Sequence, residues 1–127
     1  MSRDHRNLRV FILADELAVQ IYRATRHFPA DEQFGLRGQL RRSAVGAANA
    51  IVEGSARRTT AEYVQFLNLA NGSAAEASYL LGLSQRLGYV TAAVSDELAG
   101  RYEELRRGLQ SMMKRFEPEI VSRSRRA

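Results

Sequence analysis

Arginine is the residue type in this 127-residue sequence that is best suited to chemistry, since it supplies 18 of the 19 basic side chains. A guanidinium group stays charged at neutral pH and can donate two parallel hydrogen bonds to one phosphate group. The first candidates for contact with a phosphate backbone are Arg3, Arg6, Arg9, Arg57, Arg58 and Arg115. Their residue type favours the binding of a polyanion over catalysis.

Arg41 and Arg42 form a second candidate group. One interpretation is a further phosphate-binding patch, and the other is ion pairing with acids such as Asp31 or Glu76. Because adjacent residues of a helix point about 100° apart, one arginine can serve the fold while the other faces solvent.

Groups that could catalyse a reaction or hold a metal ion are few. The sequence has no cysteine, and its histidines are His5 and His27. No Glu-x-x-His pair, Gly-rich phosphate loop or Gly-x-Ser-x-Gly elbow is present. We expect no catalytic residue, no metal and no cofactor, and hence a non-enzymatic protein. The run from Arg23 to His27 resembles, at shorter spacing, the Arg/His centre of ribonuclease toxins, so ribonuclease activity is a remote alternative.

The elements that must position these side chains are all predicted to be helices. Apolar residues recur at three- and four-residue spacing over about 8–27, 31–53, 60–87 and 92–116. Thr59 and Glu62 have the spacing of a capping box, and Gly88 is a suitable helix stop. Since the links are short, neighbouring helices should be antiparallel, which predicts an all-α, up-down-up-down four-helix bundle. The bundle forms a single domain over 1–127, with basic, flexible tails at 1–7 and 118–127.

This topology predicts where the charge lies. Both tails, the link between the second and third helices and the end of the fourth helix should share one end of the bundle. That end would hold ten basic and five acidic residues, which accounts for the whole formal net charge of +5. A polyanion contact and a pair of merely solvated tails are both compatible with this charge.

Small residues are the second unusual feature of the predicted helices. The packing candidates are Ala44, Ala47, Gly72 and Ser73, whose surroundings are small on more than one face, together with Glu53 and Glu76. Such helices usually pack on more than one face, which predicts close contacts within or between subunits; the alternative is that alanine simply favours helix. Glu53 is disfavoured beside a helix C-terminus, so we expect an arginine partner, either Arg57 or Arg58 or one from a neighbouring subunit.

Several segments carry a family resemblance. They are Phe28-Pro29-x-x-Glu32-x-Phe34-Gly35-Leu36, Gln39-Leu40-Arg41-Arg42-Ser43-Ala44, Ile51-Val52-Glu53-Gly54-Ser55-Ala56-Arg57-Arg58, Glu62, Phe66-Leu67, Ala70-x-Gly72-Ser73-x-x-Glu76 and Leu87-Gly88-Tyr89. Over roughly residues 10 to 116 the sequence resembles the four-helix-bundle family encoded by intervening sequences of bacterial 23S rRNA genes, which is related to accessory proteins of diversity-generating retroelements. One departure is that Ala50 occupies a position where the family commonly has asparagine, with Asn49 one residue earlier.

The resemblance implies a homopentameric ring without established catalysis, and nucleic-acid binding as the suspected activity. We therefore expect an oligomer that binds RNA or DNA with low sequence specificity through an arginine-rich end. The alternative is an assembly or scaffold module that binds another protein, conceivably a reverse transcriptase. We expect a cytoplasmic location and no membrane partner, because the start lacks a signal-peptide apolar region and no apolar run approaches the roughly 20 residues of a membrane span.

Overall fold

The computed structural model describes residues 3–126, and for Ser124 and Arg126 it describes the backbone alone. The four long helices are α1 (Arg9–Ala24), α2 (Leu36–Ser55), α3 (Thr60–Arg86) and α4 (Ala92–Arg126), and the short 3-10 helices are η1 (His5–Asn7) and η2 (Ala30–Glu32). No strand occurs within residues 3–126. The prediction of an all-helical chain with four long helices is therefore confirmed.

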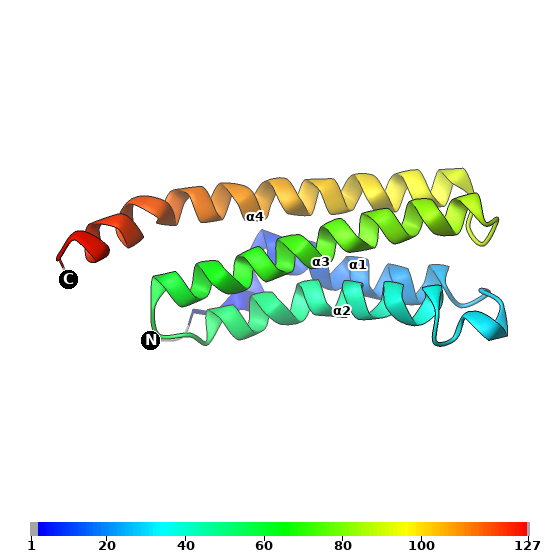
Figure 1. Ribbon diagram of the computed structural model, residues 1–127, viewed down its shortest axis with the longest axis horizontal. Coiled ribbons are helices and arrows are strands. Elements are labelled where there is room, and N and C mark those ends of the chain that lie inside the picture. The colour runs from blue at the N-terminus through cyan, green and yellow to red at the C-terminus, as the bar shows by residue number, and fades with distance from the viewer. Residues whose placement is uncertain (1–2, 127) are drawn as a thin grey trace.

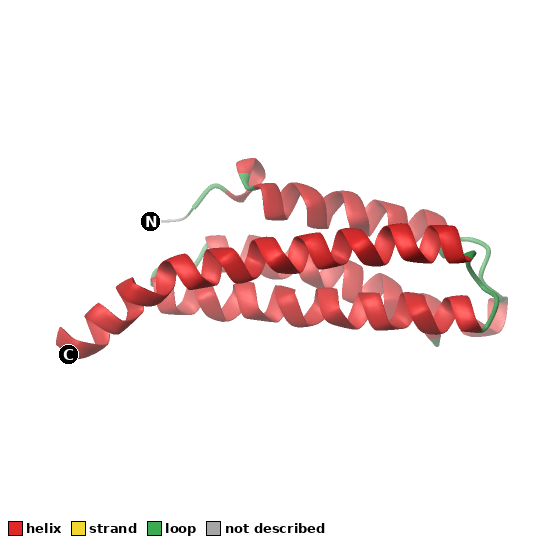
Figure 2. Cartoon of the chain, turned by 90° about the horizontal axis from the view of Figure 1, so that it is seen from above, coloured by secondary structure: helices red, strands yellow, loops and turns green. Residues whose placement is uncertain are grey.

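The four long helices lie side by side as rods, and successive helices are joined at alternate ends of the molecule (Figure 1). Each long helix packs against two others, because the contacting pairs are α1 with α2, α2 with α3, α3 with α4 and α4 with α1. Both termini and the α2–α3 link lie at one end, and α4 extends past the other helices there (Figures 1 and 2).

Side chains from all four long helices fill the core between them. The largest fully buried apolar side chains are Leu17, Ile21, Leu40, Ile51, Tyr63, Leu67, Leu81, Tyr102, Leu105 and Leu109. Ala44 and Ala47 are also fully buried, so the structure places them in the core of the chain itself. Gly54 allows α2 to approach α3, since a Cβ there would lie 2.7 Å from Cβ of Phe66.

Both ends of α3 follow from local sequence. The Thr59 hydroxyl accepts a hydrogen bond from the Glu62 N–H at 3.2 Å, which fixes the first turn. At the other end Gly88 has a φ of 81°, and the Tyr89 N–H donates to the Ser84 carbonyl at 2.9 Å. This is the Schellman arrangement, in which a left-handed glycine stops the helix.

The start of α2 differs from the expected position. Residues 30–32 form η2 instead of the first turn of a long helix, and α2 begins at Leu36 after Gly35. Gly35 has φ −100° and ψ −123°, which interrupts the helical path, and the Glu32 carboxylate accepts the Leu36 N–H at 3.2 Å. The Glu32 side chain therefore accepts one of the backbone N–H groups that have no partner within the helix at the start of α2.

The segments expected as tails are engaged in the fold where the structure describes them. At the C-terminal side α4 continues to Arg126 through Pro118, and its last turns curve away from the line of the helix (Figure 1). Proline removes one N–H donor from the helix. Next to it, the Glu119 carboxylate accepts a hydrogen bond from the Thr60 hydroxyl at 2.7 Å, which ties this part of α4 to α3. Residues 1, 2 and 127, also part of the expected tails, lie outside the described residues.

Candidate functional site

The end of the bundle that holds both termini carries exposed basic side chains on three elements. They are Arg9 of α1, Arg57 and Arg58 of the α2–α3 link, and Lys114 and Arg115 of α4. We call these five residues the basic end. The Arg57 guanidinium lies 4.7 Å from the centre of the Phe66 ring, which holds it on a flat apolar support. The side chains of the basic end can donate hydrogen bonds to phosphate oxygens.

Arg3 has a different environment from the other arginines near the start. Its guanidinium lies 4.4 Å from the centre of the Tyr63 ring and 5.9 Å from that of Phe116. It donates to the Thr60 hydroxyl at 3.3 Å, and its backbone N–H donates to the Ser55 carbonyl at 2.6 Å. Arg3 thus joins the N-terminal segment to α2, α3 and α4, and its guanidinium is occupied within the fold.

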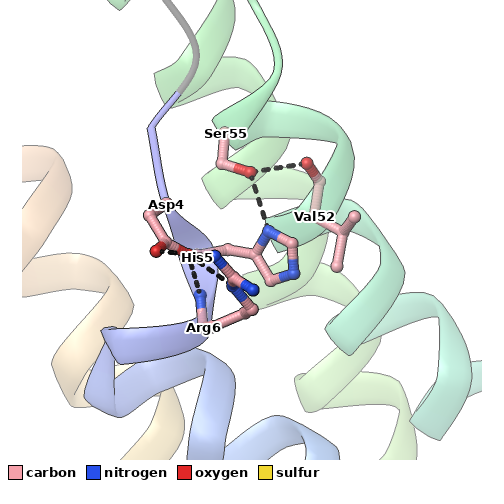
Figure 3. Close-up of polar contacts among 5 residues, drawn as sticks. All are labelled: Asp4, His5, Arg6, Val52 and Ser55. Atoms are coloured by element: carbon pink, nitrogen blue, oxygen red, sulfur yellow. Dashed lines mark hydrogen bonds and ion pairs between the residues drawn. The ribbon is translucent and has the colours of Figure 1, made fainter.

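Asp4 and Arg6 form an ion pair within the N-terminal segment (Figure 3). The Arg6 guanidinium donates to both carboxylate oxygens of Asp4, at 3.0 and 3.2 Å. These hydrogen bonds hold the pKa of Asp4 below its usual value. Of the three arginines near the start, Arg9 is the one left on the surface without a side-chain partner among the described contacts.

His5 and Ser55 also meet at this end, with His5 Nδ1 3.4 Å from the Ser55 hydroxyl (Figure 3). The serine hydroxyl donates its proton to the Val52 carbonyl at 2.7 Å. A serine nucleophile needs a base that takes that proton, whereas here the proton is directed to a backbone oxygen. The pair therefore fixes the N-terminal segment against α2 and is not arranged as a nucleophile with its base.

A groove of about 800 Å³ runs between α1 and α4 from the basic end. Its apolar lining consists of Leu8, Val10, Ile12, Leu13, Leu105 and Met112. Its polar and charged lining consists of Asn7, Arg9, Glu16, Arg101, Glu104, Arg107, Ser111 and Arg115. We call this site the α1/α4 groove. It shares Arg9 and Arg115 with the basic end, so the groove opens at that end of the bundle.

Arg107 and Arg101 are site residues that sequence reasoning missed. Arg101 donates to the Glu16 carboxylate at 2.9 Å across the groove, whereas Arg107 is exposed. A signal was present, because Arg107, Ser111 and Arg115 are spaced by four and must lie on one face of a helix. What the spacing could not reveal is that this face borders α1.

The structure separates the roles of Arg41 and Arg42. Arg41 donates to the Thr25 hydroxyl at 2.9 Å and to the Tyr22 carbonyl at 3.2 Å, and its guanidinium lies 4.5 Å from the centre of the Tyr22 ring. It therefore fastens α2 to the end of α1, through neutral oxygens and not through Asp31 or Glu76. Arg42 is exposed, as expected for the next residue of a helix.

Within its own chain, Glu53 has an asparagine partner in place of the expected Arg57 or Arg58. It is exposed, and its carboxylate accepts a hydrogen bond from the Asn49 side-chain amide at 3.1 Å, one helical turn away. Among the side chains that the structure describes, no arginine pairs with it, and Arg57 stacks on Phe66 instead. The amide donor thus compensates in part for a carboxylate near the end of α2.

The remaining packing candidates, on α3, divide between its surface and its inner side. A Cβ on Gly72 would meet no atom within 4 Å, whereas Ser73 lies inward, with its hydroxyl 3.3 Å from a Cβ built on Gly46. Leu69 and Tyr79 flank Gly72 on the same side of the helix and are 58% and 62% exposed. We define Leu69, Gly72, Glu76 and Tyr79 as the outer α3 face, an apolar and small-residue stripe on the surface of the chain.

The described residues contain no group of three or more His, Cys, Asp or Glu side chains placed to hold a metal ion. His27 is exposed at the start of the α1–α2 link. No described helix is long and apolar enough to cross a membrane.

Comparison with known proteins places this geometry in a family. The sequence matches the model of a family described as 23S rRNA-intervening sequence protein over residues 6–111. Among solved structures, the chain is similar to a protein of unknown function of the S23 ribosomal protein family from Bacteroides thetaiotaomicron. The two share 25% sequence identity with a TM-score of 0.77, over 83% of this chain and 95% of that one. No curated protein matches the sequence. The family match over most of the chain, together with the shared helical fold, shows that the chain belongs to the 23S rRNA-intervening sequence protein family.

Proposed function

We propose that this chain is an up-down-up-down antiparallel bundle that acts as a non-enzymatic, cytoplasmic, oligomeric protein and binds nucleic acid with low sequence specificity. The observation that carries the proposal is the basic end, where three elements each place exposed basic side chains: Arg9 on α1, Arg57 and Arg58 on the α2–α3 link, and Lys114 and Arg115 on α4. Contacts between arginine and phosphate supply affinity that does not depend on sequence. The proposal includes no base-reading element, because the chain has no zinc-finger or helix-turn-helix signature.

We propose a homopentamer as the assembly state, in keeping with the family resemblance. Leu69, Gly72 and Tyr79 of the outer α3 face support self-association, because exposed apolar side chains grouped on one face mark interaction surfaces. A closed ring would repeat the basic end around one axis and so multiply the local positive potential.

Salt-dependent binding tests the proposed activity. Fluorescence anisotropy with labelled RNA and DNA should give affinities that fall steeply as salt rises, and similar affinities for unrelated sequences. The variant Arg57→Ala with Arg58→Ala should weaken binding about tenfold or more at low salt. The matched control is Arg23→Ala with Arg26→Ala, two exposed arginines near the other end of α1, which should change binding less than about threefold. Absence of binding, or binding that is insensitive to salt, would contradict the proposal.

The alternative function is a scaffold that binds a protein partner, such as the reverse transcriptase implied by the relationship to retroelement accessory proteins. The apolar character of the outer α3 face favours this alternative. Material that co-purifies with the protein distinguishes the two functions. Loss of that material after nuclease treatment supports nucleic-acid binding, and its retention supports a protein partner.

A further inference from the structure

We infer that the α1/α4 groove is the binding site of a single nucleic-acid strand, which enters from the basic end and runs along α4 toward Arg107. This inference rests on the proposed nucleic-acid binding and adds to it a class of ligand and a location. It starts from the continuity of the two surfaces, because Arg9 and Arg115 belong both to the basic end and to the lining of the groove.

The charges along the groove are arranged in a row. Arg107, Ser111 and Arg115 follow one another at intervals of four residues, so the two arginines lie about 12 Å apart along one side of α4. Arg9 faces them from α1, and Asn7 adds a neutral donor. Of the two acids in the lining, Glu16 is paired with Arg101 at 2.9 Å, and Glu104 lies beyond Arg107, at the end of the row farthest from the basic end. A chain of phosphates fits this row better than an isolated anion, which would use one arginine.

The width of the groove favours a single strand over a duplex. Neighbouring packed helices have axes about 8 to 10 Å apart, so a duplex is too wide to descend between α1 and α4 and could touch only the rim. A single strand has bases that can turn inward, and Leu8, Ile12 and Leu13 offer them an apolar surface. The lining contains no aromatic side chain, so we expect modest affinity for each nucleotide and little preference among bases.

The burial of the groove floor argues against a partner helix as the occupant. A helix that docks in a groove gains affinity by covering exposed apolar side chains. Here Val10, Leu105 and Met112 are already buried by the bundle, and Ile12, at 45% exposure, is the one strongly exposed apolar side chain of the lining. The exposed apolar surface is therefore centred on Ile12 and does not form the long stripe that a docked helix would cover, whereas the arginine row remains available to phosphates.

The test introduces one negative charge inside the groove and the same charge just outside it. Ser111→Glu places a carboxylate between Arg107 and Arg115, and Gln110→Glu places one on the neighbouring exposed residue, which is not part of the lining. Anisotropy is measured on the full chain with a labelled single-stranded RNA, its DNA counterpart and the duplex of the same sequence. We expect Ser111→Glu to weaken single-strand binding about tenfold and Gln110→Glu to change it less than about twofold. Arg107→Gln should lower the slope of log affinity against log salt by about one.

The outcomes separate this inference from the proposed function. Equal effects of Ser111→Glu and Gln110→Glu, or equal affinity of wild type for single strand and duplex, would overturn the groove as a single-strand site. Loss of binding in Arg57→Ala with Arg58→Ala, but not in Ser111→Glu, would overturn the groove and leave the basic end as the site. Failure of the wild type to bind any of the probes would instead overturn the proposed function itself.

Two further measurements keep the result specific. Polyglutamate of matched charge should compete at least tenfold less well than single-stranded RNA, and equal competition would overturn the assignment to a nucleic-acid strand. Sedimentation should show the same assembly state for Ser111→Glu and wild type, since a changed state would assign the groove to a contact between subunits. Far-ultraviolet circular dichroism should be unchanged for these variants, because Arg107, Gln110 and Ser111 are exposed.

Discussion

The arginines of this chain perform different tasks, and the environment of each guanidinium decides which. Arg3 and Arg41 lie over tyrosine rings and donate to threonine hydroxyls, so their guanidinium groups hold elements of the fold together. Arg58 and Arg107 are exposed and are free to meet a ligand. Residue type alone therefore overstates the binding surface, because a guanidinium with aromatic and hydroxyl partners is also a packing group.

Arg3→Ala should destabilise the fold more than Arg6→Ala. Arg3 loses contacts with two aromatic rings and a hydroxyl, which together are worth about 1 to 2 kcal/mol. Arg6 loses an exposed pair with Asp4, and such pairs contribute little to stability because water screens them. Urea unfolding followed by circular dichroism measures both changes. Equal losses in the two variants would show that the Arg3 contacts do not stabilise the N-terminal segment.

Tyr102 links burial to a dependence of stability on pH. It is fully buried, and burial raises its pKa in the folded protein well above that of an exposed tyrosine. An unfolded tyrosine ionises near pH 10, so above about pH 10 the unfolded state loses a proton that the folded state keeps. The free energy of unfolding should therefore be fully retained below about pH 10 and fall as the pH rises further.

Tyr102→Phe should make this alkaline fall shallower. Near pH 7 the variant should be at least as stable as wild type, because the Tyr102 hydroxyl has no hydrogen-bond partner among the described residues. Urea unfolding at about pH 7 and about pH 10.5 measures both effects, with Tyr22→Phe as the matched control, because Tyr22 is exposed and the variant keeps its ring. A loss of more than about 1 kcal/mol at pH 7 would contradict the absence of a partner.

At the scale of elements, helix ends that depend only on neighbouring residues could be predicted from the sequence. Thr59 and Gly88 gave both ends of α3 to within one residue, because a cap and a left-handed stop involve only nearby backbone. The start of α2 was misplaced because Gly35 and the carboxylate of Glu32 move the helix start beyond the turn that follows Pro29.

The candidate site could be predicted only in part for a related reason. The topology placed Arg9, Arg57, Arg58 and Arg115 at one end, and the structure shows all four exposed there. The engagement of Arg3 depends on Thr60, 57 residues away, and the groove depends on which face of α4 borders α1. Such long-range contacts are set by side-chain packing and leave no periodic signal in the sequence.

Two exposed glycines give a test of the helix boundary. Gly88→Ala should destabilise the protein by about 1 kcal/mol, because alanine disfavours the φ of 81° that ends α3. Gly100→Ala, within α4, should instead stabilise it by about 0.5 to 1 kcal/mol, since alanine is the better helix former and no atom lies within 4 Å of the added Cβ. Thermal unfolding distinguishes the two signs, and a shift of the same sign for both would contradict this account of the α3 stop.

At the scale of the whole molecule, charge and exposed apolar surface occupy different places. The basic end lies at the termini, and the outer α3 face lies along the side of the bundle. Self-association through the side of the bundle would leave the basic end uncovered. Several copies of that end could then contact one strand, and linked contacts raise apparent affinity well above that of a single subunit.

Leu69→Asp should therefore separate the subunits and weaken nucleic-acid binding together. Leu69 is 58% exposed on the outer α3 face, so a charge there is tolerated in a single chain and is costly only where another surface covers it. Val19→Asp is the matched control, because Val19 is 47% exposed on α1, the long helix that does not pack against α3. Sedimentation should show a smaller species for Leu69→Asp alone, with unchanged circular dichroism, and anisotropy should show affinity reduced about tenfold or more. If Leu69→Asp keeps the assembly of wild type, the outer α3 face is not the contact; if it dissociates without loss of affinity, one basic end suffices for binding.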